Sequence, residues 1–190
     1  MKKIISPISR FDLEKELNEE TFIRKTNFCN HDIYIVDFKN QRNTSMEIGR
    51  LRELTFRNAG GGTGKSFDLD EFDTREEAFY KQLIVWDPDE KQIIGGYRFM
   101  QGSDIINSKK FNNSATNTLF NYNDDFYKNI FPYTIELGRS FVQPAYQPSS
   151  GNRKAIFSLD NLWDGLGALV VDYPEIQYLF GKVTMYLDFD

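Results

Sequence analysis

The sequence predicts an α/β (α+β) domain with a central mixed β-sheet flanked by helices. Three observations lead to this fold class: several short segments rich in β-branched and aromatic residues, two longer segments with apolar residues at helical spacing, and a strand–helix–strand order near the C-terminal end. A tight turn joins antiparallel strands, whereas a helical crossover joins parallel ones. A sheet with both kinds of connection is mixed.

The first half of the chain is expected to hold two helices and one strand. Residues 12–20 are polar and helix-prone, and residues 32–38 read as a strand or an extended arm. Residues 46–57 place apolar side chains between charged ones at the spacing of an amphipathic helix. The glycine-rich residues 59–64 end this helix, and an acidic loop, residues 68–73, follows.

The second half begins with a β-hairpin. Residues 80–86 and 92–100 are its strands, with a turn at residues 87–89, and the polar residues 101–125 carry few signals of regular structure. The remaining segments predict a strand, a long amphipathic helix and a final strand, joined by a parallel crossover. They are residues 133–142, 152–171 and 178–187.

Length, charge and cysteine content limit the class of protein. A chain of 190 residues fits one domain, residues 1–190. The net charge of −5 provides no positive field to attract nucleic acid. One cysteine permits no internal disulfide, the N-terminal residues lack the apolar core of a signal peptide, and no apolar run reaches transmembrane length. We expect a cytoplasmic protein, soluble or peripheral to the inner face of the membrane.

Three motifs suggest chemistry that the rest of the sequence does not support. Cys29 and His31 cannot build a four-ligand zinc site, so we expect no metal and interpret them as a packed cysteine beside a surface histidine. Residues 59–66 (AGGGTGKS) match a loosened phosphate-binding loop, but they follow a helix and precede four carboxylates. This order favours a flexible substrate lid over residues 60–73. Residues 138–142 resemble a nucleophile elbow without its final glycine.

Seven residues in four places form the candidate site. Glu136 and Arg139 are three apart on one strand, so they point to opposite faces of the sheet unless a bulge at Gly138 re-aims one of them. Each charge taken singly is most simply a solvated surface residue. The seven residues are Arg52 and Phe56 on one helix face, Asp70 and Asp73 in the acidic loop, Arg98 on the hairpin, and Glu136 with Arg139.

These residues lie in blocks that resemble the GNAT-fold N-acyltransferases of ornithine- and glycine-lipid synthesis, a group also labelled hemolysins. The resemblance runs from about residue 48 to residue 186. A sparser version of the pattern occurs in acyl-homoserine-lactone synthases: an Arg and a Phe four apart, two Asp three apart, a strand Arg, and Glu-x-x-Arg. The blocks are LRELTFRNAGGGTGKSFDLDEFD, YKQLIVWDPDEKQIIGGYRFM, IELGRSFVQPAYQPSSGNRKAIFSLDNLWDGLGALVVDYP and YLFGKVTMY.

The resemblance implies a GNAT-like acyl-CoA N-acyltransferase fold. It also implies transfer of a fatty or 3-hydroxy fatty acyl group from an acyl carrier protein or CoA thioester to the amine of glycine or ornithine, in amino-acid lipid synthesis. No cofactor would stay bound, because the thioester is a co-substrate. The partners are then acyl carrier protein and a small amino acid, with peripheral membrane association left open.

Roles follow for the candidate residues. Glu136 would be the base that deprotonates the acceptor ammonium, and Arg98 or Arg139 would hold the acceptor carboxylate. Backbone N–H groups near the Gly138 bulge would stabilise the oxyanion. Substrate contacts are expected from Arg52, Phe56, Asp70 and Asp73, although the two aspartates can instead hold Arg52 in a structural ion network. The donor phosphate is expected at Ser150, Gly151, Asn152, Arg153 and Lys154, at the start of the long helix.

Two departures from the family pattern are evident. Only part of the donor-binding loop, Arg/Gln-x-x-Gly-x-Gly/Ala, remains in residues 147–153. The chain is also shorter than the family pattern, so it is either a short member or lacks C-terminal elements. The alternative function is a non-catalytic, membrane-associated or lipid-binding protein of the same fold. A membrane-lytic activity ranks third, because no strongly cationic amphipathic helix is present.

Overall fold

The computed structural model describes residues 1–183 and confirms a mixed sheet. Six strands lie in chain order, β1-β2-β3-β4-β5-β6. Neighbours are antiparallel from β1 to β5, and β5 and β6 are parallel, as the strand–helix–strand order predicted. The strands are β1 (Phe22–Lys25), β2 (Asp32–Val36), β3 (Lys81–Asp87), β4 (Gln92–Gln101), β5 (Thr134–Val142) and β6 (Tyr178–Gly181).

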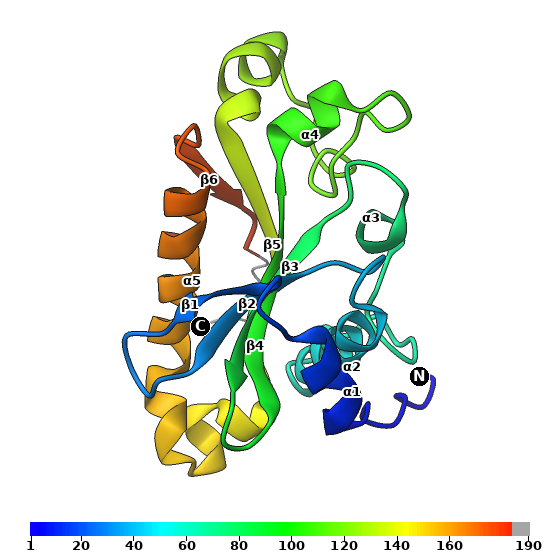
Figure 1. The fold of residues 1–190 in the computed structure, drawn as a ribbon. Helices are drawn as coiled ribbons and strands as arrows, with labels where there is room; N and C mark the ends of the chain where they lie inside the picture. Colours follow the sequence, from blue (N-terminus) through cyan, green and yellow to red (C-terminus); the bar gives the residue numbers. More distant parts are fainter. Residues whose placement is uncertain (184–190) are drawn as a thin grey trace, which may run out of the picture.

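Helices cover both faces of this sheet. Figure 1 shows α1 and α2 on one side of the strands and α5 on the other. Within residues 1–183, no helix is both long and apolar enough to cross a membrane. The helices are α1 (Arg10–Glu16), α2 (Arg42–Asn58), α3 (Glu71–Thr74), α4 (Gly102–Asn107) and α5 (Ser158–Asp172).

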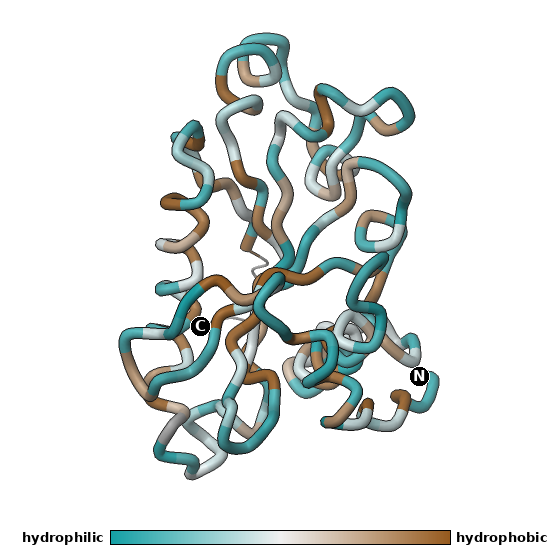
Figure 2. Tube along the Cα trace, in the orientation of Figure 1, coloured by the Kyte–Doolittle hydropathy of each residue, from teal (hydrophilic) through white to brown (hydrophobic). Residues whose placement is uncertain are grey.

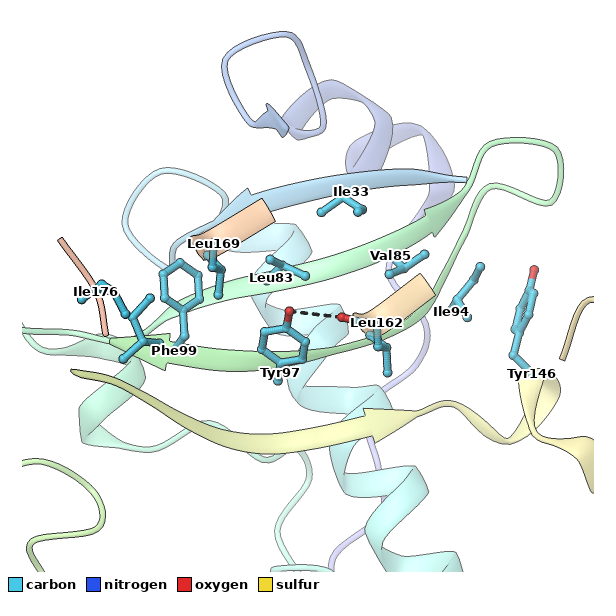
Figure 3. Packing of buried hydrophobic residues seen from close by; sticks show 11 residues of the cluster. Ile33, Leu83, Val85, Ile94, Tyr97, Phe99, Tyr146, Leu162, Leu169 and Ile176 are labelled. Atoms are coloured by element: carbon cyan, nitrogen blue, oxygen red, sulfur yellow. Dashed lines mark hydrogen bonds between the residues drawn. The ribbon is translucent and has the colours of Figure 1, made fainter. Parts of the chain in front are cut away.

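Two hydrophobic clusters hold α1, α2 and α5 to the sheet. Strand alternation sends Leu83 and Tyr97 toward α5, where Figure 3 shows them packed with Leu162 and Leu169. The Tyr97 hydroxyl donates to the Leu162 carbonyl at 3.4 Å. The opposite face, with Ile84 among its residues, packs on α1 and α2. Hydrophobic residues accordingly line the central strands in Figure 2, while the peripheral loops are mostly hydrophilic.

Several elements begin or end where the sequence did not predict. Helix α2 starts at Arg42, four residues early, because the Glu16 carboxylate accepts hydrogen bonds from the backbone N–H groups of Asn43 and Thr44 at 3.0 and 2.7 Å. Strand β1 was missed, since it is a mostly exposed edge strand. Helix α4 and the short α3 were also missed. The final strand was expected to reach residue 187, but residues 184–187 lie outside the described part of the chain.

The start of the long helix was predicted wrongly. Residues 153–157 form a 3-10 turn, and the α-helix begins only at Ser158. Its apolar positions also divide between two faces. Leu162 and Leu169 are buried against the sheet, whereas Leu159 and Trp163 are exposed. An apolar residue at helical spacing therefore does not by itself identify the buried face.

The interpretation of Cys29 and His31 was reversed. Cys29 is exposed, in the turn between β1 and β2, where its φ is +65°. His31 is buried, and its Nδ1 lies 2.9 Å from the Asn161 amide nitrogen on α5. His31 also faces Asp87, with 3.7 Å between Nε2 and Oδ2. The histidine thus joins the sheet to α5.

Two glycines of α5 provide a matched test of this packing. A Cβ at Gly165 would lie 2.5 Å from Leu83 Cδ2, whereas a Cβ at Gly167 meets nothing within 4 Å. We expect Gly165→Leu to lower the free energy of unfolding by about 1–3 kcal/mol through overpacking. Gly167→Leu should raise it by roughly 0.5–1 kcal/mol through helix propensity. Urea denaturation measures both, and equal effects would contradict the observed orientation of α5.

Candidate active site

One cavity brings most of the candidate residues together. It has a volume of about 700 Å³ and lies where α2, α3 and the loop at residues 115–119 meet β4, β5 and Tyr80, the residue before β3. Phe56, Asp70, Arg98, Glu136 and Arg139 all line it. The other lining residues are Ala59, Gly61, Phe72, Tyr80, Ala115, Thr116, Thr118, Leu119, Leu137, Gly138, Ser140, Lys182 and Val183.

A β-bulge places Glu136 and Arg139 at the same cavity. Arg98 pairs with Gly138 and Gly96 pairs with Phe141, so β5 has one residue more than β4 between these pairs. Arg139, directly after Gly138, has a φ of +53°. The bulge expected at this position is confirmed, and it explains how residues three apart on a strand line one cavity.

Beneath the cavity, Arg52 is fully buried in an ion network. Its Nε lies 3.3 Å from Asp68 Oδ2, and its Nη1 lies 3.5 Å from Asp73 Oδ1. The Gln82 amide donates to the same Asp73 oxygen at 2.8 Å. Neither Arg52 nor Asp73 lines the cavity, so the structure does not support the predicted direct substrate contacts. The alternative, a structural ion network, describes both residues.

Arg98 connects this network to the cavity. Its Nη1 donates to Asp70 Oδ1 at 2.8 Å and to Asp73 Oδ2 at 3.0 Å. The three-residue spacing of the aspartates has a local cause, because they form a capping box. The Asp70 side chain accepts from the Phe72 N–H, and the Asp73 side chain accepts from the Asp70 N–H. One short helix thus presents both carboxylates to Arg98.

The third arginine, Arg139, is about one-third exposed at the cavity wall. Its Nε lies 3.2 Å from Asp68 Oδ2, and its Nη2 lies 3.9 Å from Asp70 Oδ2. Three arginines therefore face Asp68, Asp70 and Asp73, so the formal charges of the network sum to zero. A substrate that carries one positive and one negative group would preserve this balance.

The network also fixes charge states. Burial is the largest single effect on Asp73 and opposes its ionisation. The charges of Arg52 and Arg98, together with hydrogen bonds from the Asp70 N–H and the Gln82 amide, lower the pKa of Asp73 below its ordinary value. Burial alone would lower the pKa of Arg98, but the charges of Asp73 and Asp70 raise it above the ordinary value. Asp73 and Arg98 are consequently both charged at neutral pH.

Glu136, on β5, also lines the cavity and is 1% exposed. Its Oε1 accepts from the Tyr80 hydroxyl at 2.6 Å, and from the Thr116 N–H and hydroxyl at 3.0 and 2.7 Å. Its Oε2 is buried and has no hydrogen-bond partner within residues 1–183. A buried carboxylate oxygen without a partner is costly unless a ligand pairs with it.

The glycine-rich residues 59–66 have a structural role that the sequence did not predict. Helix α2 ends in a Schellman motif at Gly60, whose φ is +80°, with Gly60 N–H donating to Arg57 O and Gly61 N–H to Phe56 O. The buried Glu53 carboxylate then accepts from the N–H groups of Thr63 and Gly64 at 3.0 and 2.8 Å. The order remains helix before loop, which is unlike a phosphate-binding loop.

Those contacts correct the expectation of a flexible lid over the whole glycine-rich and acidic segment. Thr63 and Gly64 are held by Glu53, and Asp68 and Asp73 are buried. Of the glycine-rich residues 59–66, Ala59 and Gly61 line the cavity.

The predicted donor-binding residues lie apart from this cavity, and none of the five lines it. Ser150 ends a 3-10 turn, and Gly151 follows with a φ of +74°. Arg153 begins the 3-10 turn before α5, so Arg153 and Lys154 are not at an α-helix N-terminus. The predicted helix-terminus phosphate site near Asn152 was therefore based on a wrong helix start.

Tyr80 and Thr116 are the site residues that sequence reasoning missed. Tyr80, expected as the first residue of a hairpin strand, directly precedes β3, and Thr116 lies in the polar stretch that carried few structural signals. Nothing in the local sequence indicates that Thr116 is buried. Its burial is explained only by the contact with Glu136, which is distant in the chain.

Comparison with known proteins agrees with this fold. The family model described as acetyltransferase (GNAT) domain matches residues 51–155, more than half of the chain. The chain therefore belongs to the GNAT acetyltransferase family, a family of acyltransferases. No solved structure matches it.

Two curated relatives carry the name glycine N(alpha)-acyltransferase. The relative from Bacteroides thetaiotaomicron is 51% identical over 98% of this chain and 55% of its own length. The relative from Phocaeicola vulgatus is 48% identical over 98% of this chain and 57% of its own length. The chain thus spans little more than half the length of these relatives.

The shared carboxylate of Asp73 gives a stability prediction. Asp73→Asn leaves Arg52 and Arg98 short of one buried negative charge, so the free energy of unfolding should fall by about 3–5 kcal/mol. Because the folded-state pKa of Asp73 is lowered, its contribution is present above roughly pH 4 and is lost as pH falls through the lowered value. The difference in free energy of unfolding between the wild type and Asp73→Asn, measured by urea denaturation, should therefore shrink in acid.

The control is Asp124→Asn, which removes an exposed ion pair with Lys128. It should change the free energy of unfolding by less than about 0.5 kcal/mol. A gap for Asp73→Asn that stays constant into strong acid would contradict the assignment of a shared, ionised carboxylate.

Proposed function

We propose that this chain is the acyl-transfer domain of an N-acyltransferase whose acceptor is glycine and whose donor is a fatty or 3-hydroxy fatty acyl thioester. The observation that carries the proposal is the buried Glu136 carboxylate, with an unpartnered oxygen, in the same cavity as Arg98 and Arg139. The names of the two relatives support glycine over ornithine as the acceptor.

The cavity offers partners for both ends of a small amino acid. The acceptor ammonium binds at Glu136, and the acceptor carboxylate binds at a guanidinium. Arg139 is the better candidate for the carboxylate, because it is partly exposed and its nearest carboxylate contacts are longer than those of Arg98. The Nε of Arg98 is buried without a hydrogen-bond partner in the described part of the chain, which leaves it as a second donor.

The reaction moves one acyl group and two of the three ammonium protons. Glu136 takes a proton from the ammonium, and the neutral amine attacks the thioester carbonyl carbon. The C–N bond forms, the C–S bond breaks, and sulfur leaves as a thiol with one of the former ammonium protons. The third proton stays on the amide nitrogen, and Glu136 returns its proton to solvent.

The donor and the setting of the reaction belong to the same proposal. Acyl carrier protein is the proposed carrier, with CoA as the alternative, and the product would be an N-acyl amino acid for lipid synthesis in the cytoplasm. Peripheral membrane association finds support in the exposed Leu159 and Trp163 on α5. The acidic Asp160 between them opposes attraction to anionic lipids.

Replacement of the proposed base tests the function directly. The full chain is incubated with glycine and a long-chain acyl thioester, and N-acylglycine is measured by mass spectrometry. Glu136→Gln keeps the shape of the side chain but cannot accept the proton, so the transfer rate should fall by roughly 10²–10⁴-fold. The exposed Glu175→Gln is the control and should leave the rate unchanged. Wild-type turnover by Glu136→Gln would remove Glu136 from the mechanism.

The carrier can be tested separately from the chemistry. An acidic carrier and an acidic chain repel each other, so docking needs a local basic patch, for which Arg153 and Lys154 are the proposed residues. Arg153→Glu with Lys154→Glu should raise the KM for acyl carrier protein several-fold and leave kcat nearly unchanged. Acyl-CoA as donor is the matched control. If the double variant keeps wild-type KM and salt dependence with the carrier, docking occurs elsewhere.

A further inference from the structure

Glu136 is held by one of its two oxygens only. Three donors converge on Oε1: the Tyr80 hydroxyl, the Thr116 hydroxyl and the Thr116 N–H, all within 2.6–3.0 Å. The second oxygen, Oε2, has none within residues 1–183. Tyr80 directly precedes β3 and Thr116 lies in the loop at residues 115–119, and neither was among the seven candidate site residues.

The direction of each hydrogen bond follows from its neighbours. The Tyr80 oxygen accepts the Ala115 N–H at 3.0 Å, which leaves its own proton for Glu136. Burial, and then the charge of Glu136, raise the pKa of Tyr80 above its ordinary value, so Tyr80 keeps that proton at neutral pH. A backbone N–H can only donate. Oε1 is therefore an acceptor in every one of these contacts.

An oxygen that accepts three hydrogen bonds has no place for a proton of its own, so protonation of this carboxylate is directed to Oε2. We propose that Tyr80 and Thr116 are positioning residues that hold Glu136 by Oε1 and make Oε2 the atom that takes the proton of the acceptor ammonium. This inference rests on the proposed function for the acceptor, and on the hydrogen bonds alone for the choice of oxygen.

The surroundings of Glu136 contain other charged and titratable groups. Arg98 on β4 lines the same cavity, and its guanidinium carbon lies 4.7 Å from the centre of the Tyr80 ring. Lys182, after β6, interacts with the Glu136 charge, as does Tyr122, whose hydroxyl lies 3.3 Å from Ser114 Oγ. Thr116→Val also removes a hydroxyl that hydrogen-bonds to Tyr122, whereas Tyr80→Phe does not, so a shift common to both variants reports the donors on Oε1.

The test uses two measurements on the full chain. The first is the pH dependence of kcat/KM with glycine and an acyl thioester. The second is direct titration of the Glu136 carboxyl by NMR, with ¹³C-labelled glutamate and Glu136→Gln for assignment. Loss of a donor destabilises the ionised carboxylate, so Tyr80→Phe and Thr116→Val should each move the NMR midpoint and the acid limb of the rate profile upward by about one pH unit.

Matched variants separate positioning from stability. Thr116→Ser keeps the hydroxyl and should restore the wild-type midpoint. Tyr97→Phe removes another buried hydroxyl, the one bonded to Leu162 O on the opposite face of the sheet, and should leave the midpoint unchanged. If the midpoint and the acid limb stay in place in both Tyr80→Phe and Thr116→Val, the inference is wrong. Absence of any transfer by the wild type would instead overturn the proposed function, while the NMR titration would still decide the role of Tyr80 and Thr116.

Discussion

The Asp73 carboxylate, shared by two buried arginines, is the interaction on which the site depends. Arg52 comes from α2, Arg98 from β4, and Asp73 from the short α3 between them. A single buried charge would be prohibitively costly, so each member requires the others. The network therefore fixes the position of α3 against the sheet and, with it, the cavity wall that Asp70 and Phe72 contribute.

The same network reaches Glu136 through one aromatic ring. The Arg98 guanidinium lies over the Tyr80 ring, and the Tyr80 hydroxyl donates to Glu136. The rigid Tyr80 side chain thus contacts a cation, Arg98, at its ring face and a carboxylate, Glu136, at its hydroxyl. Charged groups from elements far apart in the chain are thus connected without a direct ion pair between Arg98 and Glu136. This separation leaves a guanidinium and a carboxylate at different places on the cavity wall.

Sequence reasoning predicted the mixed sheet, its hairpin and its crossover because these depend on local periodicity and turn residues. It also grouped five residues that line the cavity, but through resemblance and not through spacing. It failed where distant contacts decide the outcome. Glu16 begins α2 early, and Thr116 is buried because Glu136 needs donors. The start of α5 was predicted wrongly for a different reason, because residues 153–157 have helical spacing but adopt a 3-10 turn.

The bulge after Gly138 shows why a conflict between patterns is informative. Glu136 and Arg139 are three apart, which contradicts strand alternation if both are to serve one cavity. The chain resolves this with an arginine at a φ of +53°, a conformation that costs a non-glycine residue about 1–3 kcal/mol. Contacts of Arg139 with Asp68 and Asp70 hold it there. A strand that keeps such a residue does so against local preference, and local preferences are most often violated at functional sites.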